Sequence, residues 1–257
     1  MDKKLEAFQR SLEILDRLRV ECPWDRKQTN ESLRIHTIEE TFELADAIIK
    51  DDTENIKVEL GDVLLHILFY AKIADEKKQF DIADVCNALN DKLIYRHPHI
   101  FGAVEAATAD DVSRNWEILK LREHKNKTVL EGVPNSLPSV IKAHRIQDKA
   151  RNVGFDWSNR EEVWDKVKEE ISEVQAEIDQ MDADRLEEEF GDLMFSLINA
   201  ARLYKVDPDN ALERTNQKFI RRFNYIESQL KEKGQTFDEA GLEEMDRLWN
   251  EAKRQGL

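Results

Sequence analysis

The sequence KEEISEVQAEIDQMDADRLEEEFGDL, residues 168–193, concentrates acidic side chains within two stretches that otherwise have the pattern of apolar helices. The clustered carboxylates are those of Glu169, Glu170, Glu173, Glu189 and Asp192. Residues three or four positions apart share one face of an α-helix, so Glu170 and Glu173 form a like-charge pair. Such a pair costs about 0.2–0.5 kcal/mol on an exposed helix, and more as water is removed. The pattern therefore predicts a bound cation that offsets the repulsion.

The first half of the chain repeats this acidic pattern at Glu39, Glu40, Glu43, Glu59 and Asp62. The spacing from Glu40 to Glu59 equals the spacing from Glu170 to Glu189. Three further pairs match in the same order: Trp24-Asp25 with Asp156-Trp157, Lys92-x-x-x-Arg96 with Lys218-x-x-x-Arg222, and Trp116-x-x-x-Lys120 with Trp249-x-x-x-Lys253. The sequence therefore predicts a tandem duplication.

The composition favours an all-α fold. Only 8 Gly and 5 Pro occur among 257 residues, and 36% of the residues are charged, which is typical of helical proteins rather than β-rich or disordered ones. The formal net charge of −15 opposes nucleic-acid binding. The charged N-terminus and the lack of an apolar run of about 18 residues predict a cytoplasmic protein without membrane contact. Cys22 and Cys86 fit no zinc or disulfide pattern and are expected to be reduced.

Glycine, proline and asparagine interrupt the helical pattern between Lys125 and Pro138. We therefore predict an N-terminal helical domain at 1–124, a linker at 125–139 and a C-terminal helical domain at 140–257. The run Val63–Ala71 is apolar on all sides, so we expect neighbouring helices to cover most of it. The polar segment 51–53 is expected to cap the helix that follows it.

Clustered carboxylate oxygens suit Mg²⁺, with Mn²⁺ as a substitute, and both ions commonly share their remaining coordination positions with substrate phosphates. A di-iron site requires Glu-x-x-His, and none of the six histidines has Glu three positions before it. A single EExxE segment in so acidic a chain also fits a solvated helix face, but its repetition beside the most apolar runs favours a metal site. Gly61 and Gly191 share one repeat position, which either close helix packing or ligand clearance explains.

Cationic and aromatic residues complete the set that a nucleotide requires. Lys218 and Arg222 fall one helical turn apart, as do Trp249 and Lys253, which offers charges for phosphate oxygens and an indole for a base. Each residue alone is also typical of a surface cation or a core tryptophan. The sequence has no GxxxxGK[ST] or GxGxxG segment, so phosphate binding would depend on the metal and these side chains. His66, in the apolar run, is expected to be a hydrogen-bonded core residue.

The chain resembles the MazG family of nucleoside triphosphate pyrophosphohydrolases, within the all-α NTP pyrophosphatase superfamily. The resemblance covers nearly the full length and rests on the doubled EExxE and ExxD segments, CPWD at 22–25, YRHPHIF at 95–101, VGFDW at 153–157 and KFIRRF at 218–223. It implies two tandem all-α MazG-type domains and a homodimer. It also implies Mg²⁺-dependent hydrolysis of an NTP or dNTP to the monophosphate and pyrophosphate, in house-cleaning or nucleotide-pool control.

The resemblance also implies roles for individual residues. The implied metal ligands are Glu170, Glu173, Glu189 and Asp192 in the second copy and Glu40, Glu43, Glu59 and Asp62 in the first. Glu169 and Glu170 are the implied catalytic carboxylates, with Glu169 orienting or deprotonating the water that attacks the α-phosphorus. From the spacing and charge of the cationic and aromatic residues, we predict as substrate-binding residues Lys166, Arg185, Glu188, Lys218, Arg222, Trp249 and Lys253.

The two copies differ in the charge near their acids. Lys166 precedes Glu170 by one turn, whereas His36 stands at the matching place before Glu40. Likewise, Arg185 stands where the first copy has Asn55. We therefore predict that residues 140–257 carry most of the activity. Two other interpretations stay open at this point: a helical interaction protein stabilised by divalent cations, and a narrower dUTP or dCTP pyrophosphatase.

Overall fold

The computed structural model describes residues 2–102, 128–180 and 183–257, together with Thr108, Val112, Asn115, Trp116 and Leu119. All regular elements in these residues are helices, which confirms the predicted all-α fold. The chain divides into an N-terminal unit, Met1–Val112, and a C-terminal unit, Ser113–Leu257. The predicted linker, 125–139, falls in the second unit, and its residues 125–127 lie outside the described residues. The domain limits at 124 and 140 therefore remain predictions.

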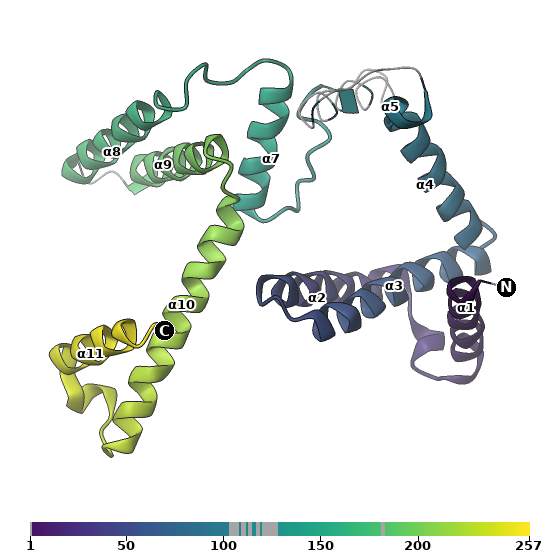
Figure 1. Cartoon of the computed structure of the whole chain (residues 1–257), viewed down its shortest axis with the longest axis horizontal. Helices are drawn as coiled ribbons and strands as arrows, with labels where there is room; N and C mark the ends of the chain where they lie inside the picture. The colour runs from purple at the N-terminus through teal and green to yellow at the C-terminus, as the bar shows by residue number, and fades with distance from the viewer. Residues whose placement is uncertain are drawn as a thin grey trace. The chain divides into compact units, whose positions relative to one another are not determined.

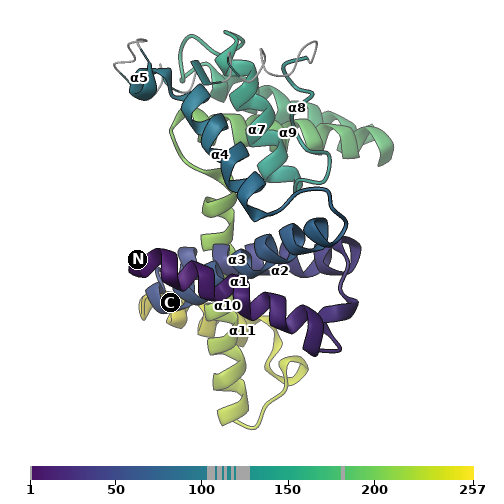
Figure 2. The same ribbon diagram turned by 90° about the vertical axis from the view of Figure 1, so that its right-hand side faces the viewer.

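The N-terminal unit consists of α1 (Lys3–Glu21), a 3-10 turn (Asp25–Lys27), α2 (Asn30–Ile49), α3 (Thr53–Glu76), α4 (Ile82–Arg96) and α5 (Pro98–Phe101). Helices α2 and α3 lie side by side (Figures 1 and 2). Asp52 caps α3 by accepting a hydrogen bond from the Asn55 amide at 3.2 Å, as the sequence predicts. Thr29 and Ser32 cap α2 reciprocally. These caps fix where the two acid-bearing helices begin.

The apolar run Val63–Ala71 in α3 is only partly covered. The small core of this unit consists of Leu15, Leu33, Leu68, Phe69 and Ile73. His66, Leu68, Phe69 and Ala71 are buried, whereas Leu64, Leu65 and Ile67 are 37%, 38% and 45% exposed. The expectation that neighbours cover most of this run therefore holds from His66 to Ala71 apart from Ile67, and it fails at Leu64, Leu65 and Ile67 in the described single chain.

His66 is confirmed as a buried, hydrogen-bonded core residue. Its Nδ1 lies 2.9 Å from the Thr37 hydroxyl, which also contacts the Tyr70 hydroxyl. Burial, followed by the charge of His36, lowers the pKa of His66 and favours the neutral ring. A neutral imidazole is the form that a packed core accepts at lowest cost.

The C-terminal unit consists of α7 (Ser139–Asn152), α8 (Val163–Gln180), α9 (Ala183–Leu203), α10 (Pro208–Glu232) and α11 (Phe237–Arg254). Helices α8 and α9 pair through Val163, Val167 and Ala200. Helix α11 folds back along α10, away from the α8–α9 pair (Figure 1), and packs on Ile226 and Leu230. No described helix in either unit has both the length and the apolar character needed to cross a bilayer.

An ion pair with the buried Arg202 fixes the segment that joins α7 to α8. Gly154 adopts a φ of 91°, in the left-handed region that favours glycine. Two residues later, the Asp156 carboxylate accepts hydrogen bonds from the Arg202 guanidinium at 2.5 and 3.0 Å. Only 5% of the Arg202 side chain is exposed, and Asn199 holds it from the same helix. The segment 153–157 is thus fastened to α9.

We expect Asp156→Asn to lower the free energy of unfolding by about 3 kcal/mol, because it leaves a buried guanidinium without its counter-charge. Urea unfolding of the full chain measures this change. Asp165→Asn is the matched control: it breaks the exposed Lys168–Asp165 pair of 2.9 Å and is expected to cost at most about 0.5 kcal/mol. Equal effects of the two substitutions would contradict the role assigned to Asp156.

Candidate active site

In the C-terminal unit, the α8–α9 pair brings three of the predicted ligands together. Carboxylate oxygens of Glu170 and Glu173, one turn apart on α8, and of Glu189 on α9 lie within 4.8 Å of one another. Glu170 is 4% exposed, and its Oε2 is buried without a hydrogen-bond donor among the described residues when the acids are ionised. A buried carboxylate oxygen without a partner is costly. The group of three carboxylates, all of them hard oxygen donors, fits Mg²⁺ or Mn²⁺.

Lys166 supplies positive charge at the edge of this cluster. Its Nζ lies 2.8 Å from Glu170 and 2.9 Å from Glu169. These hydrogen bonds, to Glu170 first and Glu169 second, raise the pKa of Lys166 and keep it protonated. The pKa of the Glu173 carboxyl is also raised, first by a shared hydrogen bond with Glu170, then by desolvation and by repulsion from Glu170 and Glu189. Lys166 alone therefore does not balance the negative charge of the carboxylates in this cluster.

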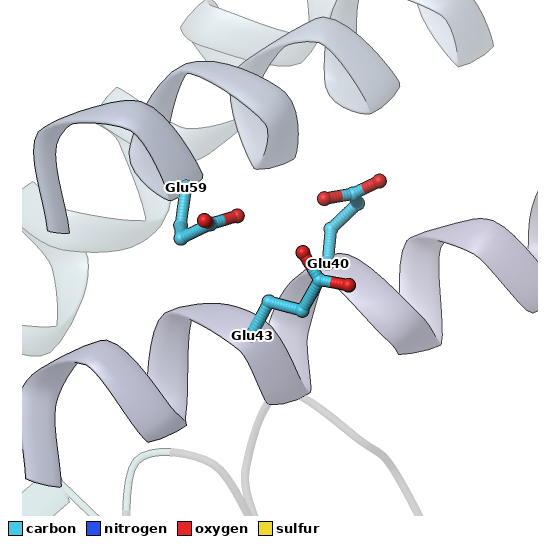
Figure 3. Close-up of side chains that lie close together, drawn as sticks. All are labelled: Glu40, Glu43 and Glu59. Carbon is cyan, nitrogen blue, oxygen red and sulfur yellow. The ribbon is translucent and has the colours of Figure 1, made fainter. Parts of the chain in front are cut away.

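The N-terminal unit contains the matching cluster. Glu40 and Glu43 on α2 face Glu59 on α3 (Figure 3), and oxygens of the three carboxylates lie within 4.8 Å of one another. Burial, then repulsion from Asp62 and Glu43, raises the pKa of Glu40. Burial, then repulsion from Glu43 and Asp62, likewise raises the pKa of Glu59. The duplicated spacing thus produces two similar carboxylate groups, each between two paired helices.

The two clusters differ in nearby cations, as the sequence comparison indicates. The His36 ring lies 3.4 Å from Glu39 rather than against Glu40. Among the described residues, no lysine or arginine forms an ion pair with Glu40, Glu43 or Glu59. In the C-terminal unit, by contrast, Lys166 contacts the buried Glu170 directly.

The other predicted residues lie around the clusters rather than within them. Asp62 and Asp192 each follow the last clustered glutamate by one turn, Asp62 half-buried and Asp192 exposed. Glu169 and Glu188 are exposed, and Arg185 lies 4.0 Å from Glu177. Glu177 was not predicted from the sequence, although its position four residues after Glu173 places it on the same face of α8.

The predicted base-binding and phosphate-binding residues of α10 and α11 contact one another. Trp249 packs against Phe219 with ring centroids 5.0 Å apart. The Arg222 guanidinium lies 5.4 Å from the Trp249 ring centroid, and its Nε donates to the Leu257 carbonyl at 2.7 Å. Lys218 and Lys253 are exposed. Within the described single chain, none of these four side chains contacts the carboxylates of α8 and α9.

Sequence reasoning also missed a cavity between α7, the segment 153–157 and α9. Gln147, Phe195 and Asn199 contribute to its walls. These residues stand in ordinary amphipathic helices and match no motif, so only the resemblance at VGFDW pointed to this region. The packing of α7 against α9 creates the cavity.

Comparison with known proteins places these observations in a family. The model of the MazG nucleotide pyrophosphohydrolase domain matches residues 28–101 and residues 159–226. Each matched segment contains one complete carboxylate cluster. The two matches confirm the predicted tandem repeat of all-α domains.

Full-length relatives give the same result. A nucleoside triphosphate pyrophosphohydrolase of Escherichia coli (strain K12) is 40% identical over 98% of this chain and 99% of its own length. A nucleoside triphosphate pyrophosphohydrolase/pyrophosphatase MazG of Thermotoga maritima is 42% identical over 96% of this chain and 95% of its own length. The uncharacterized protein YabN of Bacillus subtilis (strain 168) is 45% identical over 90% of this chain and 48% of its own length. The chain therefore belongs to the MazG nucleotide pyrophosphohydrolase family and is, like the members of that family, a hydrolase.

Proposed function

We propose that the protein is a Mg²⁺-dependent nucleoside triphosphate pyrophosphohydrolase that converts an NTP or dNTP to the monophosphate and pyrophosphate. The observation that carries this proposal is the buried Glu170, which is clustered with Glu173 and Glu189 and whose Oε2 has no hydrogen-bond partner among the described residues. A divalent cation is the ligand that such a group of oxygens fits. The names of the full-length relatives support a nucleoside triphosphate as the substrate.

Glu170, Glu173, Glu189 and Asp192 would hold the cation in the C-terminal unit, with Glu40, Glu43, Glu59 and Asp62 as the matching set in the N-terminal unit. When bound, Mg²⁺ lowers the pKa of water and neutralises charge that develops on phosphate oxygens, and Mn²⁺ is expected to replace it. We assign the main activity to the C-terminal unit, because Lys166 is the only lysine or arginine that forms an ion pair with either cluster among the described residues.

Individual residues are proposed to have separate roles in the reaction. Glu169 is exposed and held at 2.9 Å by Lys166, so it is placed to accept a proton from the attacking water. Lys166 also restrains Glu170 at the edge of the cluster. Arg185 and Glu188, on the first turns of α9, are proposed to contact the substrate beside Glu189.

Lys218, Arg222, Trp249 and Lys253 are proposed to meet the substrate from α10 and α11. Because these helices lie away from the α8–α9 pair within one chain, we further propose that the active form is a homodimer. The exposed Leu64, Leu65 and Ile67 of α3 offer apolar surface for such an association. Light scattering that gives the mass of one chain at working concentration would contradict this part of the proposal.

The direct test is to incubate the protein with each of the eight common nucleoside triphosphates and Mg²⁺, and to measure pyrophosphate and orthophosphate separately. We expect pyrophosphate and the monophosphate in equal amounts, with activity lost in EDTA and restored by Mg²⁺ or Mn²⁺. Release of orthophosphate alone would show a different phosphatase. Absence of any release with either metal would favour a non-catalytic helical interaction protein.

A further inference from the structure

Two histidines stand together where α4 meets α5, outside both carboxylate clusters. His97 and His99 flank Pro98, and the centroids of their imidazole rings lie 5.6 Å apart, with the ring planes inclined by 52°. Both residues are half-buried. Imidazole is the side chain with which proteins most commonly bind transition metals. The pair is therefore a candidate metal site of a different chemistry from the carboxylates.

A backbone carbonyl fixes the tautomer of the His97 ring. Its Nδ1 lies 2.7 Å from the Leu93 carbonyl oxygen, and because a carbonyl oxygen only accepts, Nδ1 carries the hydrogen and donates it. In the neutral ring, Nε2 then holds the free lone pair. Histidines that bind metals almost always donate their other ring N–H group to a carbonyl, a carboxylate or a water in this way. His97 thus has the hydrogen-bond partner and the tautomer of a metal ligand.

The remaining ring nitrogens are not used elsewhere. Within the described parts of the chain, no hydrogen bond or ion pair engages Nε2 of His97 or either ring nitrogen of His99. Half-buried polar atoms of this kind gain most from a ligand that needs lone pairs. A metal ion is such a ligand.

The backbone between the two rings is held in one turn. Pro98 has a fixed φ and stands at the first position of α5. The His97 carbonyl accepts hydrogen bonds from the amides of Ile100 and Phe101 at 2.9 and 3.0 Å. The Gly102 amide donates to the Pro98 carbonyl at 2.9 Å. Two ligands on a preset turn lose less conformational entropy on binding an ion than two ligands on a free chain.

The separation of the rings fits one shared ion. A transition metal lies about 2.0–2.1 Å from an imidazole nitrogen. With about 1.2 Å more from the nitrogen to the centre of the ring, two rings on one ion have centroids about 5–6 Å apart when the angle at the metal is about 100–130°. The 5.6 Å between His97 and His99 falls in this range. The pair therefore needs no change of separation to share an ion.

The histidine pair belongs to the first copy of the repeat alone. The match of the Lys-x-x-x-Arg segments places Phe223 and Tyr225 of α10 at the positions of His97 and His99. Helix α10 continues through this position, whereas α4 ends before Pro98. Because the second copy has no imidazole here, the pair is not part of the duplicated carboxylate machinery.

We infer that His97 and His99 form a binding site for a transition-metal ion of the Zn²⁺ or Cu²⁺ class. Nε2 of His97 and one ring nitrogen of His99 bind the ion, and water completes its coordination. Imidazole nitrogen suits these ions, whereas clustered carboxylate oxygen suits Mg²⁺. The chain thus offers separate sites to two classes of metal ion.

The first test uses Cu²⁺, because its electron paramagnetic resonance spectrum shows coupling to nitrogen atoms bound directly to the metal. One equivalent of Cu²⁺ is added to the full chain in a large excess of Mg²⁺. The wild type is expected to show coupling to two imidazole nitrogens, and His97→Asn and His99→Asn should each lose that two-nitrogen pattern. Asparagine at 97 keeps an amide N–H group for the Leu93 carbonyl, so the substitution removes the metal ligand and retains the hydrogen bond.

The matched control is His36→Asn, since His36 also lies beside an acidic side chain, 3.4 Å from Glu39. This variant should keep the two-nitrogen spectrum. A wild-type spectrum with oxygen ligands alone would place copper at the carboxylates and overturn the inference. Loss of the pattern in His36→Asn but not in the other two variants would overturn it as well.

Calorimetric titration with Zn²⁺ in the same excess of Mg²⁺ gives the second test. His97→Asn and His99→Asn are each expected to raise the Kd of Zn²⁺ roughly tenfold or more, at least the loss that follows when a histidine ligand loses only its hydrogen-bond partner. His36→Asn should leave the Kd unchanged. Equal Zn²⁺ affinity of the wild type and the double variant would contradict the site. Neither measurement involves triphosphate hydrolysis, so the outcome does not depend on the proposed function.

Discussion

Replacing Glu170 with glutamine is expected to lower kcat for triphosphate hydrolysis roughly a thousandfold, whereas Glu40→Gln is expected to lower it less than about twofold. The two residues occupy the same repeat position, so the substitutions are chemically matched. They differ in surroundings: Glu170 is 4% exposed and ion-paired with Lys166, whereas no described lysine or arginine pairs with Glu40. Steady-state pyrophosphate release with saturating Mg²⁺ measures both effects.

The large expected loss at Glu170 follows from its central place in the cluster. It contributes a buried oxygen that no described residue hydrogen-bonds, and it contacts both Lys166 and Glu173. Glutamine keeps the shape but removes the charge that holds the cation. Glu187→Gln, at an exposed acid on α9 outside the cluster, is the control and is expected to leave kcat unchanged. Equal losses for Glu170→Gln and Glu40→Gln would contradict the assignment of the main activity to the C-terminal unit.

Saturating Mg²⁺ is expected to raise Tm by roughly 5–10 °C, because an ion at about one hundred times its Kd stabilises the folded state by about 2.7 kcal/mol. Glu173→Gln should have two opposite effects. In EDTA the substitution should raise Tm, because it removes the repulsion from Glu170 and Glu189. With Mg²⁺ present it should make the rise in Tm caused by the metal smaller, because one ligand is lost. Calorimetry of the wild type, Glu173→Gln and the matched Glu43→Gln in both conditions measures this. A Tm of the wild type that does not depend on Mg²⁺ would contradict the metal site.

The raised pKa of Glu173 gives this effect a pH dependence. An acid whose pKa is higher in the folded state than its ordinary 4.5 binds its proton more tightly when folded. Its contribution to stability is therefore largest at low pH and falls as the pH rises above 4.5 through the folded pKa. In EDTA, the Tm advantage of Glu173→Gln over the wild type should accordingly be smallest near pH 4 and increase with pH. With Mg²⁺ the trend should reverse, because the metal binds the ionised carboxylates.

Much of the fold followed from the sequence, because the signals that define it are local. Apolar periodicity gave helices, and the Asp51-Asp52-Thr53 segment marked the start of α3. The equal spacing of the two acidic patterns indicated the duplication that the two family matches confirm. The exposure of Leu64, Leu65 and Ile67 was not predicted, because their apolar character shows that they prefer burial but not what is available to cover them.

The candidate site was predictable in its acids and less so in its surroundings. Helical spacing alone places Glu170 and Glu173 on one face of a helix. The equal spacing of the acidic pattern in the two halves of the chain predicts that Glu189 belongs to the same site. By contrast, Trp249 and Arg222 share a repeat pattern with the first half, yet tertiary packing places them against each other on the α10–α11 pair. The orientation of the Gln147 amide depends on a backbone carbonyl 48 residues away. Contacts of this kind have no periodic signature in a sequence.

Each carboxylate cluster draws its oxygens from both members of a helix pair, α2 with α3 and α8 with α9. An ion held there closes a loop of the chain and acts as a reversible cross-link. Unlike a covalent cross-link, it stabilises the paired helices by binding only that arrangement, and it does so only while the ion stays bound. The rigidity of each helix pair would then depend on the supply of free divalent cation in the surroundings.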